Sequence, residues 1–203
     1  MDISKEVEIV GKITGQLFDN QKLRLSNKAP YNNLLLVLVD AVLQQGMNYS
    51  TFVLPRIHKL KMNSFLMNQF KHIQPDEETM EYILQVKNKR KISTLKAVVV
   101  LLHKERIYDI KALSYWLSIK NNQITILNIN GFGPKTLDYM LNLMGHETMP
   151  IDRHVFNFLY ACGYKTNKYE HATKIFENIS KKHRYKKAAL DREVWQYMKT
   201  ITI

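Results

Sequence analysis

A glycine-rich turn followed by a lysine is the part of this sequence best suited to chemistry. Residues 129–136 read INGFGPKT, with Gly131 and Gly133 separated by one residue and Lys135 two positions further on. Glycines let the backbone approach a ligand closely, and a proline after them suits the first turn of a helix. The N–H groups at the start of such a helix bind anions such as phosphate without reading sequence. An ordinary turn between two helices would account for these glycines equally well.

Two ionisable residues at and beyond this turn have the types needed for covalent catalysis. Lys135 falls in the first turn of the expected helix, where its charge opposes the positive end of the helix dipole. An uncharged lysine amine can form a Schiff base with a sugar carbon. Asp152 follows in the string IDRHV at residues 151–155, and 152 − 135 gives a separation of 17 positions. The simpler interpretations are a solvated phosphate contact for Lys135 and a helix N-cap for Asp152.

The elements that must position these residues are helical along nearly the whole chain. Apolar residues recur with a helical period, capping residues precede the apolar runs, and alternating strand patterns are scarce. The start and stop signals predict an all-α fold of roughly ten helices. One predicted helix, LLLVLVDAVLQQ, follows Asn33 and stops at Gly46, and the next contains Pro55, which should kink or break it.

Composition limits the class of protein. The chain has 203 residues, 45% of them hydrophobic, which is enough for a globular core. Its apolar runs are too short to cross a membrane, and its charged N-terminus lacks the apolar segment of a signal peptide, so we expect a cytoplasmic protein. Cys162 is the only cysteine, which excludes an internal disulfide and a cluster held by several cysteines.

The charge of the chain favours a polyanionic partner. The formal net charge is +12 at pH 7, and two clusters contribute much of it. The first lies in a predicted loop, and the second lies between the last two predicted helices. Solvated surface charge is the simpler interpretation of each cluster alone, and together they favour phosphate contacts. Their members are Lys87, Lys89, Arg90 and Lys91 in the first, and Lys181, Lys182, His183, Arg184, Lys186 and Lys187 in the second.

The turn and the IDRHV string together resemble a known family. INGFGPKTLDYMLNLMG followed by MPIDRHVFNFL is similar to the helix-hairpin-helix DNA glycosylase (HhH-GPD) superfamily, which includes endonuclease III and the 8-oxoguanine glycosylases. Lys135 matches the lysine of the members that also cut the strand, and Asp152 matches their aspartate. The resemblance implies catalytic roles for these two residues. It also implies DNA contacts from Gly131, Gly133, Thr136 and His154.

The resemblance extends to two other parts of the chain. Residues 40–45, DAVLQQ, resemble the family helix whose glutamine end enters the DNA stack, which implies DNA contacts from Gln44 and Gln45. Asp40 stands where the adenine-glycosylase branch has a glutamate, so it is a candidate for the base pocket or simply a helix-surface residue. LDREVW resembles the last helix of small archaeal 8-oxoguanine glycosylases, and its Trp195 is a candidate base contact or a core residue.

The fold implied by the resemblance has two helical subdomains with the active-site cleft between them. Residues 1–203 would form a single catalytic unit. Its first subdomain would span approximately residues 34–120. The second would contain approximately residues 121–203 together with N-terminal residues, and would begin with the helix-hairpin-helix at 124–144.

The implied function is base-excision DNA repair. The enzyme would flip a damaged or mismatched base out of double-stranded DNA, remove it, and cleave the abasic site by β-elimination through a lysine Schiff base. No metal or cofactor is implied, and we expect a monomer associated with the nucleoid, away from membranes. The alternatives are a monofunctional glycosylase, in which Asp152 activates water, and a non-catalytic DNA-binding protein. The base itself stays open among 8-oxoguanine, oxidised pyrimidines, and thymine or uracil opposite guanine.

Overall fold

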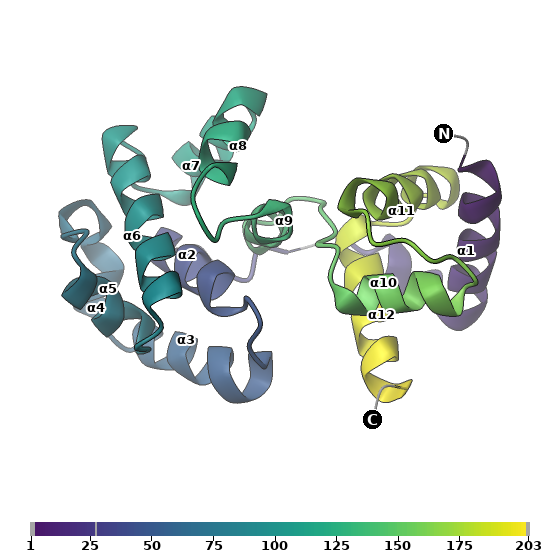
Figure 1. Cartoon of the computed structure of the whole chain (residues 1–203), viewed down its shortest axis with the longest axis horizontal. Helices are drawn as coiled ribbons and strands as arrows, with labels where there is room; N and C mark the ends of the chain where they lie inside the picture. Colours follow the sequence, from purple (N-terminus) through teal and green to yellow (C-terminus); the bar gives the residue numbers. More distant parts are fainter. Residues whose placement is uncertain (1–2, 27, 202–203) are drawn as a thin grey trace. The chain divides into compact units, whose positions relative to one another are not determined.

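The computed structural model describes residues 3–26 and 28–201 (Figure 1). Over these residues it contains twelve α-helices, two 3-10 segments and one π-helical turn, with no strand. The all-α prediction is therefore confirmed, with slightly more helices than the sequence signals indicated. Within the described residues, the helices are all too short or too polar to cross a lipid bilayer.

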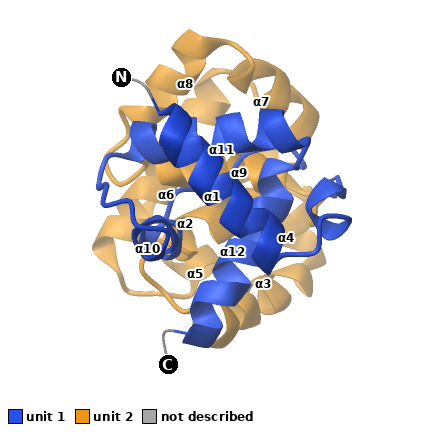
Figure 2. Ribbon diagram, turned by 90° about the vertical axis from the view of Figure 1, so that its right-hand side faces the viewer, with its two compact units in different colours: residues 1–28, 145–203 blue, residues 29–144 orange. Residues whose placement is uncertain are grey.

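The chain packs as two compact units (Figure 2). The hairpin unit contains residues 29–144, and the terminal unit contains residues 1–28 and 145–203. The sequence prediction drew the boundary near residue 120 and grouped the segment 124–144 with the C-terminal part. Packing groups this segment with the hairpin unit instead, because Phe132 and Met140 are buried in that unit's hydrophobic core.

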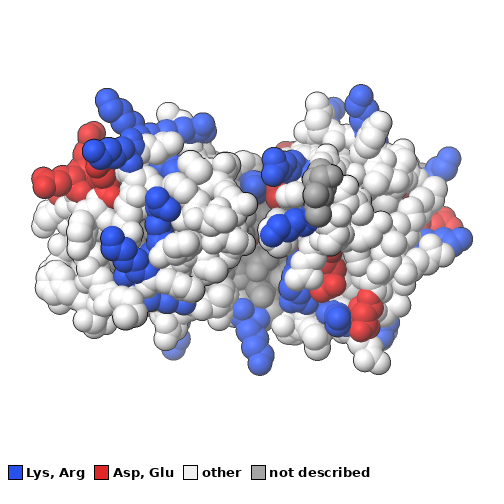
Figure 3. Space-filling model, turned by 90° about the horizontal axis from the view of Figure 1, so that it is seen from below, with Lys and Arg blue, Asp and Glu red and all other residues white. Residues whose placement is uncertain are grey.

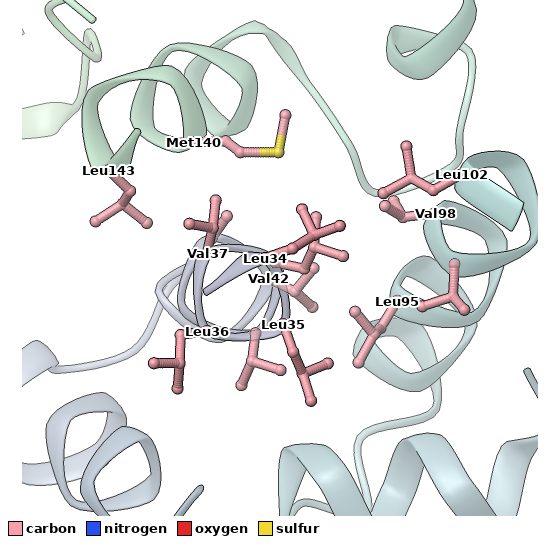
Figure 4. Close-up of a cluster of buried hydrophobic side chains, with 14 of the residues drawn as sticks. Leu34, Leu35, Leu36, Val37, Val42, Leu95, Val98, Leu102, Met140 and Leu143 are labelled. Atoms are coloured by element: carbon pink, nitrogen blue, oxygen red, sulfur yellow. The ribbon is translucent and has the colours of Figure 1, made fainter. Parts of the chain in front are cut away.

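The hairpin unit is built around one enclosed helix, α2 (Leu34–Leu43). Every residue of α2 is buried, which explains why its sequence is apolar nearly all round. Helices α3, α5, α6 and α9 pack against it, and Figure 4 shows apolar side chains of α6 and α9 around those of α2. The other elements of this unit are η2 (Tyr49–Val53), α3 (Leu54–Lys61), α4 (Ser64–Asn68), η3 (Phe70–His72), α5 (Glu77–Leu84), α6 (Lys89–Lys104), α7 (Ile110–Leu117), α8 (Lys120–Leu127) and α9 (Pro134–Leu143).

The terminal unit joins the two ends of the chain. Helix α1 packs on α11, and α10 packs on α12. Phe18, which follows α1, stacks on Phe158 of α10, and both rings contact Tyr197 of α12. A backbone hydrogen bond of 2.7 Å from Lys186 N–H to the Leu23 carbonyl also ties the N-terminal segment to the C-terminal one. The elements are α1 (Ser4–Leu17), η1 (Lys22–Arg24), α10 (Arg153–Ala161), α11 (Tyr169–His183) and α12 (Lys187–Ile201).

Two local predictions have different outcomes. The helix containing Pro55 does break: a π-helical turn ends at Val53, and α3 begins with the proline in its first turn. The loop expected around residues 87–91 is wrong, because Asn88 caps α6 and the basic residues 89–91 form the first turn of that helix. The Asn88 side chain accepts a 3.1 Å hydrogen bond from Lys91 N–H, which is the geometry of an N-cap.

Candidate functional site

The glycine-rich turn has the predicted form. Helix α8 ends at Leu127, α9 begins at Pro134, and the Phe132 N–H closes the turn with a 2.9 Å hydrogen bond to the Ile129 carbonyl. The Phe132 side chain is buried and anchors the turn in the core of the hairpin unit. The structure therefore confirms a tight turn between two helices with proline in the first turn of the second.

The two glycines of the turn have different surroundings. Gly131 has φ +86, a left-handed conformation, and an added Cβ would collide with the Thr94 side chain of α6. Gly133 has an ordinary φ of −95, and an added Cβ would meet no atom within 4 Å. The backbone of the turn thus requires glycine at position 131, whereas at position 133 the fold alone does not require it.

The start of α9 carries two of the predicted site residues. Lys135 is partly exposed in the first turn of the helix. Thr136 is only 7% exposed, and its hydroxyl accepts a 3.1 Å hydrogen bond from the Gln45 side-chain amide. The Thr136 side chain thus faces Gln45 rather than solvent, and its DNA contact stays a prediction. The hydrogen bond joins the region of Gln45, which lies just beyond α2, to the beginning of α9.

A buried lysine holds the carbonyl end of α2. The Lys91 ammonium donates hydrogen bonds to the carbonyls of Val42 (2.8 Å), Leu43 (3.0 Å) and Gln45 (2.8 Å). Burial, with the neighbouring Arg90 charge as a smaller cause, lowers the pKa of Lys91 to about 8. The sequence interpretation grouped Lys91 with surface lysines that meet phosphate, and this is wrong because the side chain is only 5% exposed.

A sequence signal for the buried lysine was available. Leu95, Val98 and Leu102 form the buried stripe of α6. Lys91 lies four residues before Leu95 and seven before Val98, so it falls on the same helical face. A lysine on a buried stripe must bring its charge to acceptors inside the protein.

Asp40 lies inside a cage of tyrosines. It has no exposed surface, and its carboxylate accepts hydrogen bonds from Tyr31 (2.6 Å), Tyr139 (3.1 Å) and Tyr49 (3.4 Å). Burial raises the pKa of the Asp40 carboxyl, and the three hydroxyl donors oppose that shift. Asp40 is therefore not the helix-surface residue of the simpler interpretation. A contact with an extruded base would require the tyrosines to move aside.

The remaining predicted residues belong to the terminal unit. Asp152 is the N-cap of α10, and its Oδ1 accepts hydrogen bonds from the N–H groups of His154 (2.8 Å) and Val155 (3.1 Å). The capping interpretation of Asp152 is confirmed, and these two hydrogen bonds fix the direction of its carboxylate. The His154 ring meets Trp195 edge-on at 6.2 Å, and the Lys199 amine lies 4.6 Å from the centre of the indole ring.

The structure thus divides the predicted residues between the two units. In the hairpin unit it brings Gln45 and Thr136 into contact beside Lys135, and it encloses Asp40. Asp152, His154 and Trp195 lie in the terminal unit. Across residues 3–26 and 28–201, no group of three histidine, cysteine or carboxylate side chains is placed to hold a metal ion.

Comparisons with known proteins give a likeness of fold. No protein-family model and no curated protein matches this chain. Among solved structures, the chain is similar to the crystal structure of the Methanocaldococcus jannaschii 8-oxoguanine glycosylase/lyase in complex with a 15mer DNA containing 8-oxoguanine. The TM-score is 0.55 and the sequence identity 16%, and the match covers 100% of both chains. At this identity the similarity is one of helical architecture.

Proposed function

We propose that this protein removes a damaged or mismatched base from duplex DNA and then cleaves the abasic site through a Schiff base on Lys135. The observation that carries the proposal is the turn itself. An open backbone at Gly133 leads into a helix whose first turn presents a partly exposed lysine. The likeness of fold to a glycosylase/lyase along the whole chain supports the same assignment.

The Gly133 geometry supports binding to a phosphate. No backbone strain and no neighbouring atom explains a glycine there, so a close approach by a ligand is a reason for the missing side chain. The N–H groups at the start of α9 point along the helix axis toward the same place, where the helix dipole also favours an anion. Figure 3 shows more Lys and Arg than Asp and Glu on the face it displays, in keeping with the net charge of +12.

The proposed chemistry follows from the types of the two ionisable residues. The Lys135 amine attacks C1′ of the extruded nucleotide, and the bond from C1′ to the base breaks with its electron pair leaving on the base. Loss of a proton from the new amine and opening of the sugar ring give the imine. Removal of a proton from C2′ then breaks the C3′–O bond and cuts the strand. Water finally hydrolyses the imine and restores Lys135.

Asp152 has two tasks in this scheme. Its negative charge stabilises the positive charge that develops on the sugar as the base departs. It also accepts the proton that the attacking amine releases. Its hydrogen bonds to the N–H groups of His154 and Val155 fix the direction of the carboxylate within the terminal unit.

A panel of duplexes tests the proposal. Each duplex carries a single lesion: 8-oxoguanine, an oxidised pyrimidine, or thymine or uracil opposite guanine. 8-Oxoguanine is the first choice because the similar structure was solved with that base in its DNA. A strand cut without alkali, together with a covalent adduct after borohydride reduction, is the expected result. Cutting only after alkali would identify a glycosylase without lyase activity, and no cutting of any duplex would overturn the proposal.

A further inference from the structure

The N-terminal part of α6 contacts two segments of the hairpin unit at once. Lys91 donates to three carbonyls at the end of α2. One turn further along the helix, the Thr94 hydroxyl lies 2.9 Å from the Asn130 carbonyl, directly before Gly131, and 2.8 Å from the Arg90 carbonyl, so it shares its proton between these two acceptors. The first two turns of α6 therefore contact both the end of α2 and the glycine turn.

Gln45 links these two segments a second time. Its carbonyl accepts from the Lys91 ammonium, and its side-chain amide donates to the Thr136 hydroxyl. Thr136 is the neighbour of Lys135 in the first turn of α9. Lys91 is therefore connected to the position of Lys135 through two successive hydrogen bonds, all within one unit.

The chemistry of the contact requires an ammonium group. A protonated lysine has three N–H donors, and three carbonyls accept them. Burial and the Arg90 charge lower the pKa of Lys91, whereas the negative end of the α2 dipole favours the charged form. An apolar side chain of the same length would fill the space but would leave the carbonyls without this donor.

We propose that Lys91 is a positioning residue of the site: it fixes the Gln44–Gln45 segment relative to the glycine turn, so that Gln45 and Lys135 meet the same nucleotide. Lys91 itself is buried and does not touch the DNA. The proposal rests on the proposed function for its effect on base excision. Its structural part concerns only the hairpin unit.

The first test compares Lys91→Met with Lys104→Met. Lys104 is the exposed last residue of α6, so this control removes an amine from the same helix without touching α2 or the turn. In Lys91→Met, backbone amide hydrogen exchange should rise at residues 44–47, 130–133 and 135–137. Single-turnover base excision should fall by about 10- to 100-fold, as expected for reacting groups misplaced by about 1 Å. Lys104→Met should match the parent in both measurements.

A second pair of variants covers the outcome in which Lys91→Met does not fold. Thr136→Val keeps the shape of the buried side chain and removes the acceptor for Gln45, whereas Thr136→Ser keeps the hydroxyl. Excision should fall in Thr136→Val and recover in Thr136→Ser, with duplex affinity close to the parental value in both. If Thr136 only stabilises the fold, Thr136→Val should have a lower melting temperature but should excise the base at the parental rate at temperatures below its melting transition. Parental excision by Thr136→Val would overturn the proposal.

The hydrogen-exchange measurement separates this proposal from the proposed function. If the parent cuts none of the duplexes, the proposed function fails, and exchange at residues 44–47 still decides whether Lys91 holds the segment. If the parent cuts DNA and a folded Lys91→Met shows parental exchange there, the positioning role fails and the proposed function stands. A combined Lys91→Met and Thr136→Val variant should lose less activity than the product of the single losses, because both act through Gln45.

Discussion

Gly131 and Gly133 occupy one turn, two positions apart, and the fold requires only the first of them to be glycine. Gly131 has φ +86 and lies against Thr94 of α6, so a side chain there is both strained and blocked. Gly133 has an ordinary backbone conformation and open space around it. One glycine therefore shapes the turn, and the other is available for a ligand.

Replacing Gly131 with alanine should mainly affect stability, whereas replacing Gly133 should mainly affect DNA binding. Gly131→Ala should lower the free energy of unfolding by about 1–3 kcal/mol, because a non-glycine residue is forced into a left-handed conformation. Gly133→Ala should leave the melting temperature near that of the parent but weaken duplex binding, since its methyl group obstructs the backbone. Thermal denaturation and a fluorescence anisotropy titration measure the two effects. Parental DNA affinity in Gly133→Ala would remove the phosphate-binding role from this turn.

Lys135→Gln should abolish the borohydride adduct and alkali-independent strand cutting, because the nucleophile of the proposed Schiff base is gone. Lys120→Gln is a matched control, since Lys120 is exposed and begins α8 in the same unit. The control should form the adduct to the parental extent. Trapping followed by gel electrophoresis and mass spectrometry of the labelled peptide gives the result. An adduct that persists in Lys135→Gln identifies another amine as the nucleophile.

Two substitutions of Asp152 should distinguish its role as a helix cap from its catalytic role. Asp152→Asn keeps a side chain that caps α10 about as well, so the melting temperature should hold while excision falls about 100- to 1000-fold. Asp152→Ala loses the cap as well, which costs about 1 kcal/mol of stability. Single-turnover rates and thermal melts of both variants provide the comparison. Parental rates in Asp152→Asn would leave Asp152 as a cap alone.

Asp40 should make stability depend on pH in a direction opposite to that of most carboxylates. Burial raises the pKa of its carboxyl in the folded protein above the ordinary value of 3.8. At a pH between the pKa of Asp40 in the unfolded chain and its raised pKa in the folded protein, the unfolded chain has released the proton and the folded chain still holds it. The free energy of unfolding therefore falls as pH rises through this window. The free energy of unfolding of Asp40→Asn should therefore increase relative to that of the parent with rising pH.

The measurement for Asp40 is urea unfolding of parent and variant between about pH 4 and about pH 8. Asp76→Asn is the control. Asp76 caps α5 at the surface, and the hydrogen bond from the Thr79 N–H is the main cause that lowers its pKa. Its difference from the parent should stay constant above about pH 6, because the Asp76 carboxyl is then ionised in both the folded and the unfolded state. A constant difference for Asp40→Asn as well would contradict the predicted titration.

Binding to undamaged duplex should be salt-sensitive and largely independent of sequence. In the proposed function, the hairpin backbone and the basic surface contact phosphates rather than base edges. Affinity should fall at least about 10-fold between about 50 and 200 mM salt, which corresponds to roughly two phosphate contacts. Titrations with two duplexes of unrelated sequence check both statements. A salt-independent affinity would show that the net charge of +12 does not serve DNA binding.

Local signals in the sequence determined the helices and the turn. Asn33, Asp109 and Asp152 cap the helices that follow them, as side chains that accept backbone N–H groups at a helix start. The spacing of Gly131, Gly133 and the proline fixed the turn before α9, because left-handed backbone and proline at a helix start are properties of a few adjacent residues. Such features need no knowledge of distant contacts.

Tertiary packing alone decided which partners the buried charged side chains contact. Lys91 looks like its neighbours Lys89 and Arg90 in the sequence, yet only Lys91 is turned to the carbonyl end of α2, 46 to 49 residues away in the chain. Asp40 likewise became the centre of a tyrosine cage, because one of its partners, Tyr139, comes from 99 residues further along. The place of Lys91 on the apolar stripe of α6 indicates that its side chain is buried, but the identity of its partners depends on which distant elements meet, and pairs so far apart in sequence leave no local pattern that reveals them.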